Sequence, residues 1–413
     1  MNQHLAACAL GVSASLAVPA HADDQVALPA PLRVADTVRI AKAQRGEVVA
    51  ARARAHAAAE RPVIAAALDD PEVFASIDHL PLMGGGADVS LMIEQRFPLS
   101  GVRGHRRRAA EAEARRERAL ADRTCLDVEL EAAAAFWMLA ELRERATLLD
   151  DQRALAEQVV AAATARLSTG AGIQADILRA QIEVDRLDGE RRAIAAELRA
   201  AAAMLDTALG RPPDAPIPEL DVAITDADPP GAGAIASTAI ANRPELRAGH
   251  AEVVRAEAEV SVMRSMYTPM AMVRTGPSYT MTEGTGWMVM VGVSIPLWRD
   301  KLRAGVNEVS AMADMAHADL EAMQRMIGGE ATAARERVAA AHERYLALRD
   351  NIVPHARQAI APALAAYAAN QAPLVSTTEA AQTLWEAQRE LAMARAELGL
   401  AWARLYRTTG EMP

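Results

Sequence analysis

Residues 287–297 read WMVMVGVSIPL, and this stretch decides how the rest of the chain is interpreted. Apolar side chains stand at every second position from Trp287 to Ile295, with Met, Gly and Ser between them. A strand that turns one face to lipid and the other to a polar lumen needs this period of two. Residues 89–97 repeat the pattern, with Gln95 as the one break in the apolar face. Proline follows both segments, at Pro98 and Pro296, and marks a passage from strand to another element because proline ends strand pairing.

The two segments belong to an internal repeat. Phe97 recurs as Ile295 and Pro98 as Pro296, an offset of 198 residues (295 minus 97). Glu47 and Glu245 share that offset, and Gly210 and Gly410 are 200 apart (410 minus 210). We therefore expect a first repeat over residues 23–210, an irregular Pro-rich linker over 211–233 and a second repeat over 234–413.

Each copy is expected to contain a helix, two strands, a very long helix and a second helix. In the first copy the pattern predicts a helix over 36–66, strands over 72–80 and 88–97, and helices over about 102–167 and 173–209. In the second it predicts a helix over 234–266, strands over 270–281 and 286–295, a long helix from about 300 and a helix over about 376–409. Pro354 and Pro362 should kink or break the second long helix.

The composition favours long helices over compact domains. The 413 residues are 51% hydrophobic but only 3% aromatic, and alanine is abundant, which is typical of helical rods. In the last helix leucine and alanine each recur at every seventh position, which predicts a coiled-coil contact; the positions are Leu384, Leu391, Leu398, Leu405, Ala380, Ala387, Ala394 and Ala401. The net charge of -10 disfavours a nucleic-acid partner. No metal-ligand, nucleophile or phosphate-loop motif is found, so we expect no enzyme activity, no catalytic residues and no cofactor.

The first 22 residues have the features of a cleaved signal peptide. An apolar stretch from Leu5 to Val18 precedes Ala20-His21-Ala22, which has small residues where signal peptidase requires them. A lipoprotein signal ending at Cys8 is the alternative. Cleavage after Ala22 leaves Cys125 as the only cysteine.

At the level of motifs, the chain resembles the TolC family of outer-membrane efflux proteins over essentially all of its mature length. The resemblance is carried by Arg96-Phe97-Pro98-Leu99-Ser100-Gly101, Ser294-Ile295-Pro296-Leu297, Asn242-Arg243-Pro244-Glu245-Leu246, Leu167-Ser168-Thr169-Gly170, Asp176-Ile177-Leu178 and Tyr367-Ala368-Ala369-Asn370. Two positions depart from the family pattern. Gly46 stands where proline is usual, and Asn370 stands where glycine is common, although Asn tolerates the left-handed conformation.

The resemblance implies a mainly α-helical fold with a membrane β-barrel portion, built as a homotrimeric α-barrel and β-barrel duct. It places the protein in the outer membrane of a Gram-negative bacterium, with a helical tunnel across the periplasm. It also implies two protein partners, a periplasmic adaptor (membrane fusion) protein and an inner-membrane pump, for which the resistance-nodulation-division type is the candidate. The function implied is passive export of substrates that the pump delivers.

The turns near 168–176 and 368–379 would form the periplasmic mouth of such a duct. We expect Gly170, Gly172 and Asn370 to take part in adaptor docking; the alternative is that they only make the turns. Asp176 is a candidate for the aperture. Its alternative role is a helix N-cap, which Ser376 would fill in the second copy.

Methionine is the feature that points to a substrate. Seven of the 18 methionines lie between 263 and 290: Met263, Met266, Met270, Met272, Met281, Met288 and Met290. Thioethers are soft ligands that suit Cu(I) or Ag(I), and Met288 and Met290 lie on the face that would line the lumen. Adaptable apolar packing is the alternative. The Phe-Pro-Leu-Ser-Gly passage, followed by basic residues, resembles the heavy-metal branch of the family (copper/silver or cobalt-zinc-cadmium). Three other functions remain open: export of drugs or organic solutes, a type I secretion duct, and a periplasmic coiled-coil adaptor or scaffold.

Overall fold

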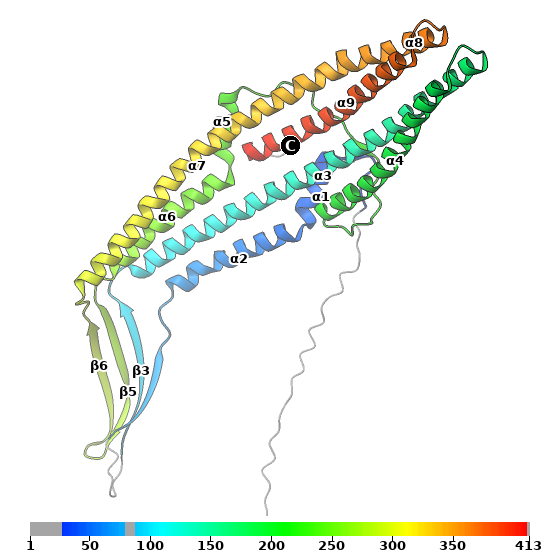
Figure 1. Ribbon diagram of the computed structural model, residues 1–413. Helices are drawn as coiled ribbons and strands as arrows, with labels where there is room; N and C mark the ends of the chain where they lie inside the picture. The colour runs from blue at the N-terminus through cyan, green and yellow to red at the C-terminus, as the bar shows by residue number, and fades with distance from the viewer. Residues whose placement is uncertain (1–26, 79–86, 411–413) are drawn as a thin grey trace, which may run out of the picture.

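The computed structural model describes residues 27–78 and 87–410 as long helical rods joined at one end to a small sheet (Figure 1). The expected signal peptide with Cys8, the end of the first strand at 79–80 and the glycine-rich loop at 83–86 lie outside the described residues. Two copies of the predicted order of elements follow each other along the chain. The first comprises α1 (Val34–Gln44), α2 (Gly46–Ala66), β2 (Glu72–Asp78), β3 (Asp88–Pro98), α3 (Val102–Ser168) and α4 (Gln174–Ala208). The second comprises α5 (Ala232–Asn242), α6 (Pro244–Ser265), β5 (Met270–Thr280), β6 (Gly284–Ser294), α7 (Arg299–Ala347), η1 (Leu348–Ile352), α8 (Val353–Ala368) and α9 (Leu374–Thr409).

The sheet combines strands from both copies. Its order is β2-β3-β5-β6 and every neighbouring pair is antiparallel. The strand register places alternate side chains on opposite faces of the sheet, as the sequence pattern predicts. One face is apolar and exposed; it includes Val73, Ile77, Val89, Leu91, Ile93, Trp287, Val289, Val291 and Val293. The opposite face carries polar, charged and Met side chains. Strands β2 and β6 are the free edges of the sheet.

The helices pack in a layer whose order is α2, α3, α6 and α7 next to the sheet (Figure 1). Farther from the sheet, α4 packs on α3, and α9 packs on α3, α7 and α8. Six of the eight predicted heptad positions of α9 are buried, with Leu398 fully buried and Leu405 2% exposed, whereas Ala380 and Leu391 are half-buried. Small residues allow close approach, since a Cβ at Gly399 would lie 2.1 Å from the ring of Trp137 in α3. Among the described residues, no helix has the length and apolar character needed to cross a membrane.

The helices expected over 36–66 and 234–266 are each two helices, which corrects that prediction. The chain leaves the helical conformation at Arg45 (φ -62°, ψ 128°) and at Arg243 (φ -61°, ψ 127°). At Arg243 the cause is Pro244, which has no N–H to donate and disfavours a helical residue before it. Gly46 takes the equivalent place in the first copy and the break is kept without proline.

The linker and the second long helix also differ in detail from the prediction. The linker contains β4 (Leu220–Asp221), which pairs in parallel with β1 (Leu32–Arg33) and ties the start of the first copy to the region between the copies. The second rod changes to π-helix over η1, just before Pro354 at the start of α8. Pro362 is accommodated inside α8, so the helix continues through it.

Candidate functional site: the helical tip and the polar face of the sheet

The tip of the molecule is made by the two helical turns that follow α3 and α8. Gly170 has φ +76° and Asn370 has φ 60°, so both turns use the left-handed conformation that glycine and asparagine tolerate. Gly172 has a different role: a Cβ there would lie 2.9 Å from the backbone nitrogen of Leu167. The predicted docking residues therefore each have a demanding backbone position. Adaptor docking itself stays a prediction.

Side chains from both copies meet at this tip. The guanidinium of Arg166 lies over the Tyr367 ring, 4.3 Å from its centre, and also donates to the Asn370 side-chain oxygen and to the Ala171 carbonyl. Tyr367 is fully buried and donates its hydroxyl to the Asp176 carboxylate at 3.4 Å. Burial, together with the charge of Asp176, raises the pKa of Tyr367, so the phenol stays protonated and able to donate. No role was predicted for Arg166 or for Tyr367, although Tyr367 begins the motif Tyr367-Ala368-Ala369-Asn370.

Neither Asp176 nor Ser376 is a helix N-cap, which corrects that alternative. Helices α4 and α9 begin at Gln174 and Leu374, and their N-caps are Ile173 and Pro373, without a side-chain hydrogen bond. Asp176 is the third residue of α4 and lies in its first turn, where a carboxylate interacts favourably with the helix dipole. Its side chain turns toward Tyr367 of the other copy.

The polar face of the sheet holds a group of thioethers. Met288 pairs with Gly276 and Met290 with Arg274, and the register puts both methionines on the face opposite the exposed apolar one. Further methionines share this polar face: Met92, Met270 and Met272. Met288 and Met290 are 40% and 43% exposed, so both residues are accessible from this face. The sheet thus presents soft donors on one face.

A buried carboxylate stands among them. Glu94 is 2% exposed and accepts hydrogen bonds from Arg274 and, at 3.0 Å, from Arg96. Arg274 comes from the second copy and also lies over the ring of Phe74, at 4.6 Å. This ion-pair group joins β3 to β5, the central pair of the sheet, and balances the charge of Glu94.

The strand-to-helix passages enclose a hollow of about 910 Å³. Pro98 and Pro296, which were predicted to mark these passages, both line it. Three arginines and three methionines are also in its wall: Arg96, Arg103, Arg106, Met266, Met270 and Met272. The hollow combines positive charge with apolar surface, so an amphipathic anion would be stabilised there more than a small cation.

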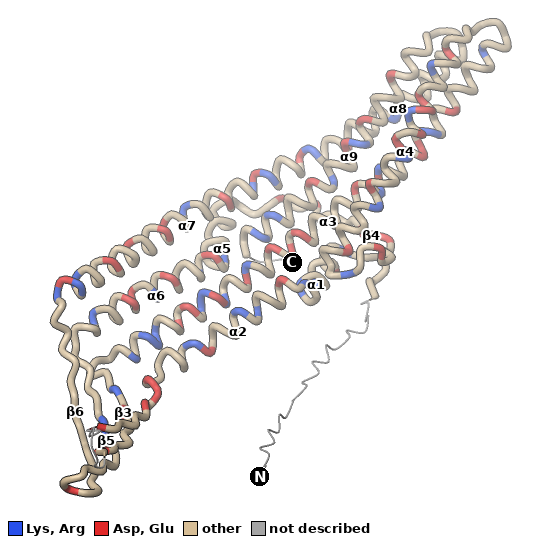
Figure 2. The backbone as a smooth tube through the Cα atoms, turned by 60° about the horizontal axis from the view of Figure 1, so that its bottom comes forward, with Lys and Arg blue, Asp and Glu red and all other residues tan. Residues whose placement is uncertain are grey.

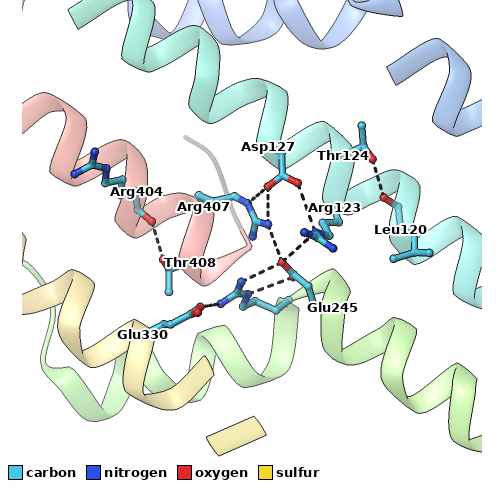
Figure 3. A network of polar contacts seen from close by, with 10 residues as sticks. Leu120, Arg123, Thr124, Asp127, Glu245, Glu330, Arg404, Arg407 and Thr408 are labelled. Atoms are coloured by element: carbon cyan, nitrogen blue, oxygen red, sulfur yellow. Dashed lines mark hydrogen bonds and ion pairs between the residues drawn. The ribbon is translucent and has the colours of Figure 1, made fainter. Parts of the chain in front are cut away.

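Ion pairs tie the two copies together midway along the rods (Figure 3). Arg407 of α9 bonds to Asp127 of α3 and to Glu245 of α6, at 2.7 Å each. Arg243 holds Glu245 and, through another nitrogen, Glu330 of α7. Burial by itself raises the pKa of Glu245, but the hydrogen bonds from Arg243 and Arg407 outweigh it and lower the pKa to about 2.

The first copy repeats part of this arrangement. Arg45 holds Glu47 at 2.7 Å and Glu131 at 3.0 Å, in the same backbone position as Arg243 with Glu245 and Glu330. The repeated Glu47 and Glu245 were visible in the sequence, but their arginine partners were not singled out. Each arginine stands two residues before its glutamate, and this shared Arg-X-Glu spacing could have predicted the pairs.

Comparison with known proteins gives a consistent result. Residues 235–411 match the model of the outer membrane efflux protein family. The outer-membrane channel OprN shares the fold with a TM-score of 0.80 and 18% identity, over 92% of this chain and 90% of that chain. VceC, an outer membrane protein from Vibrio cholerae, gives 0.79 and 16%, over 92% and 96%. CusC, whose crystal structures concern transmembrane channel formation, gives 0.81 and 13%, over 92% of each chain. A comparison with curated protein sequences finds no match.

Proposed function

We propose that the chain belongs to the TolC family of outer membrane efflux proteins, whose family model matches residues 235–411, and that three copies form a passive export duct through the outer membrane and the periplasm. The observation that carries this proposal is a sheet with one apolar face and two free edges, continued by helical rods. An open sheet leaves backbone groups unsatisfied in lipid, and closure with strands of other copies would satisfy them. The distal tip would then face the periplasm and receive the adaptor of an inner-membrane pump.

Fractionation and sedimentation test the duct. We expect the protein in the outer-membrane fraction, extractable by detergent as a homotrimer. A protein that is freely soluble in the periplasm would favour an adaptor or scaffold, and a stable monomer in detergent would contradict the duct.

For the tip we propose two roles. Gly170, Gly172 and Asn370 would shape the surface that meets the adaptor, since their backbone positions define both turns. Asp176 would belong to the aperture, since its contact with Tyr367 holds the two helical hairpins together. Site-specific photo-crosslinking from position 171 should capture the adaptor in cells. The same probe at position 283, in the turn of the opposite end, should not.

For the substrate we propose soft monovalent metal cations, Cu(I) or Ag(I). The support is the set of accessible thioethers on the polar face, since thioethers prefer soft ions. Within the described residues, no group of three or more His, Cys, Asp or Glu side chains is arranged to hold a metal ion. The thioethers are therefore the metal-binding candidates that this face offers.

Growth assays test the substrate. Deletion of the gene should raise sensitivity to silver or copper, and Met288→Leu with Met290→Leu should restore resistance only partly, since leucine keeps the volume but removes the sulfur. Met312→Leu with Met315→Leu, on the exposed surface of α7, is the matched control and should restore it fully.

Organic anions are the second candidate substrates, favoured by the arginines of the passage hollow. If deletion leaves metal sensitivity unchanged and raises sensitivity to anionic drugs or detergents, this candidate replaces the first.

A further inference from the structure

The chain has two unpartnered edges that run through both the sheet and the helical layer. Packing in the layer follows the order α2, α3, α6, α7, and the strands follow the order β2, β3, β5, β6. One edge is therefore made by α2 and β2, and the other by α7 and β6 (Figure 1). We call these the first edge and the second edge.

The two edges carry opposite charge where sheet and helices meet. On the first edge three exposed acids stand between α2 and the start of β2: Asp69, Asp70 and Glu72. On the second edge the exposed charged residues in the first turns of α7 are three bases, Arg299, Lys301 and Arg303, and one acid, Asp300, which pairs with Arg303, so positive charge is in excess; Figure 2 shows both signs at the start of α7. In the part of the chain that the structure describes, neither the Asp70 carboxylate nor the Lys301 ammonium makes a hydrogen bond or an ion pair.

Farther from the sheet the signs are reversed. Exposed Arg52 and Arg54 lie on α2, whereas exposed Asp314 lies on α7. Arg52 is 14 residues before Ala66 and Asp314 is 15 residues after Arg299, which at 1.5 Å per residue places them about 21 Å and about 22 Å from the sheet. Equal heights and opposite charges make a second complementary level.

Apolar side chains accompany the charges. Val63 and Ile64 at the end of α2 are 74% and 72% exposed, and Leu297 and Trp298 just before α7 are 72% and 78% exposed. Large apolar side chains in such exposed clusters mark a surface that associates with another molecule.

We propose that the occupant of each edge is the opposite edge of another copy of this chain, and that Asp69, Asp70 and Glu72 pair with Arg299, Lys301 and Arg303 across the contact. The geometry permits this because β2 leads away from the helices and β6 leads back to them, so β6 of one copy beside β2 of the next continues the antiparallel order. The inference rests on the proposed duct and adds the charge code that selects the partner edge and its register.

Charge reversal tests the code in the full-length protein. Asp70→Lys and Lys301→Asp should each lower the trimer-to-monomer ratio in detergent, by about fivefold or more per interface, since an attraction becomes a repulsion. Both changes in one chain should restore the trimer-to-monomer ratio, because every interface then again has one lysine opposite one aspartate. Glu283→Lys, in the turn at the other end of the sheet, is the control for net charge and should have no effect.

Cysteine cross-linking gives a second readout. Asp70→Cys with Lys301→Cys should produce dimers and trimers on oxidation. The two positions flank opposite edges of four strands, about 14 Å apart, which is too far for a disulfide within one chain. Single-cysteine variants should stay monomeric on denaturing gels. The charge code would be overturned, and the duct left intact, if each charge-reversal variant forms trimers as well as the unaltered protein does and the double-cysteine variant gives no cross-links. The duct itself would be overturned if the unaltered protein is a monomer.

Discussion

The hydroxyl of Tyr367 donates to the carboxylate of Asp176 at 3.4 Å, and this contact joins the helical hairpins of the two copies at the tip. Arg166 completes the junction by lying over the same ring and bonding to Asn370. These groups sit where the proposed duct would narrow. They fix the position of one hairpin relative to the other, so changes in them should be felt in conductance before they are felt in folding.

Arg166→Ala should loosen the tip. The change removes a cation–π contact and hydrogen bonds to Ala171 and Asn370, which together contribute about 1–3 kcal/mol. We expect a larger single-channel conductance in planar bilayers, with the midpoint of thermal unfolding lowered by only a few degrees. Arg179→Ala, at an exposed position of α4, is the control, and equal conductance of the two variants would contradict the role of Arg166.

Gly170→Ala should strain the first turn. The backbone there has φ +76°, and no atom lies within 4 Å of the added Cβ, so the cost of about 1 kcal/mol comes from the backbone alone. Hydrogen exchange of the tip amides should accelerate about fivefold, with the rods unaffected. Gly189→Ala, inside α4 with open space around it, should slow exchange or leave it unchanged.

Glu245 should make stability fall in acid. Its pKa lies at about 2 in the folded protein and at 4.5 for the free side chain, so its contribution is complete above pH 4.5 and is lost as pH falls toward 2. The full effect is about 3 kcal/mol, because one pKa unit corresponds to about 1.4 kcal/mol. Thermal unfolding of Glu245→Gln between pH 5 and pH 2.5 should show a much weaker dependence on pH.

The first copy supplies the control for that experiment. The hydrogen bond with Arg45 also lowers the pKa of Glu47 to about 2, but the Glu47 side chain is 58% exposed, compared with 13% for Glu245, so solvent screens its contribution to stability. Glu47→Gln should therefore keep nearly all of the acid dependence. If both variants behave alike, burial is not what makes Glu245 important.

Gly399→Ala should destabilise the contact between α9 and α3. The added Cβ would lie 2.1 Å from the ring of Trp137, which is 5% exposed, so the ring would have to shift from its packed position. Overpacking of this kind costs about 1–3 kcal/mol, which should appear as a lower midpoint in denaturant. Recovery of the midpoint by Trp137→Leu in the Gly399→Ala background would identify the clash as the cause.

The elements that could be predicted from the sequence are those with a strong period. Apolar residues recur at every second position in the strands and Leu and Ala at every seventh position in α9. In the structure the apolar face of the strands is exposed, and most of the heptad side chains of α9 are buried. The break at Arg243 had a local signal in Pro244, which disfavours a helical residue before it, whereas the break at Arg45 had none, because Gly46 is not a helix stop by itself. The strand within the linker was missed because its partner is at Leu32, 188 residues before Leu220 (220 minus 32).

The candidate site was predictable to the extent that it depends on local conformation. Gly170 and Asn370 were identified because positive φ restricts the residue type. The contacts of Arg166 and Tyr367 were not predicted, because the sequence around an arginine or a tyrosine in a helix does not indicate which residue about 200 positions away will face it. The N-cap interpretation of Asp176 failed because Ile173 begins the helix with backbone geometry alone.

The π-helical stretch Leu348–Ile352 has a consequence for the lengths of the two rods. From the start of α7 to the start of α9 the second copy has 75 residues (374 minus 299), and the corresponding distance in the first copy is 72 (174 minus 102). A π-turn absorbs an extra residue by widening one turn of the helix, so the side chains beyond it return to their former faces. The π-turn thus takes up part of the three-residue difference (75 minus 72), and α8 beyond it still packs on α9. An insertion has been taken up as a local bulge, and the two halves of the chain remain free to differ in length while their tips still meet.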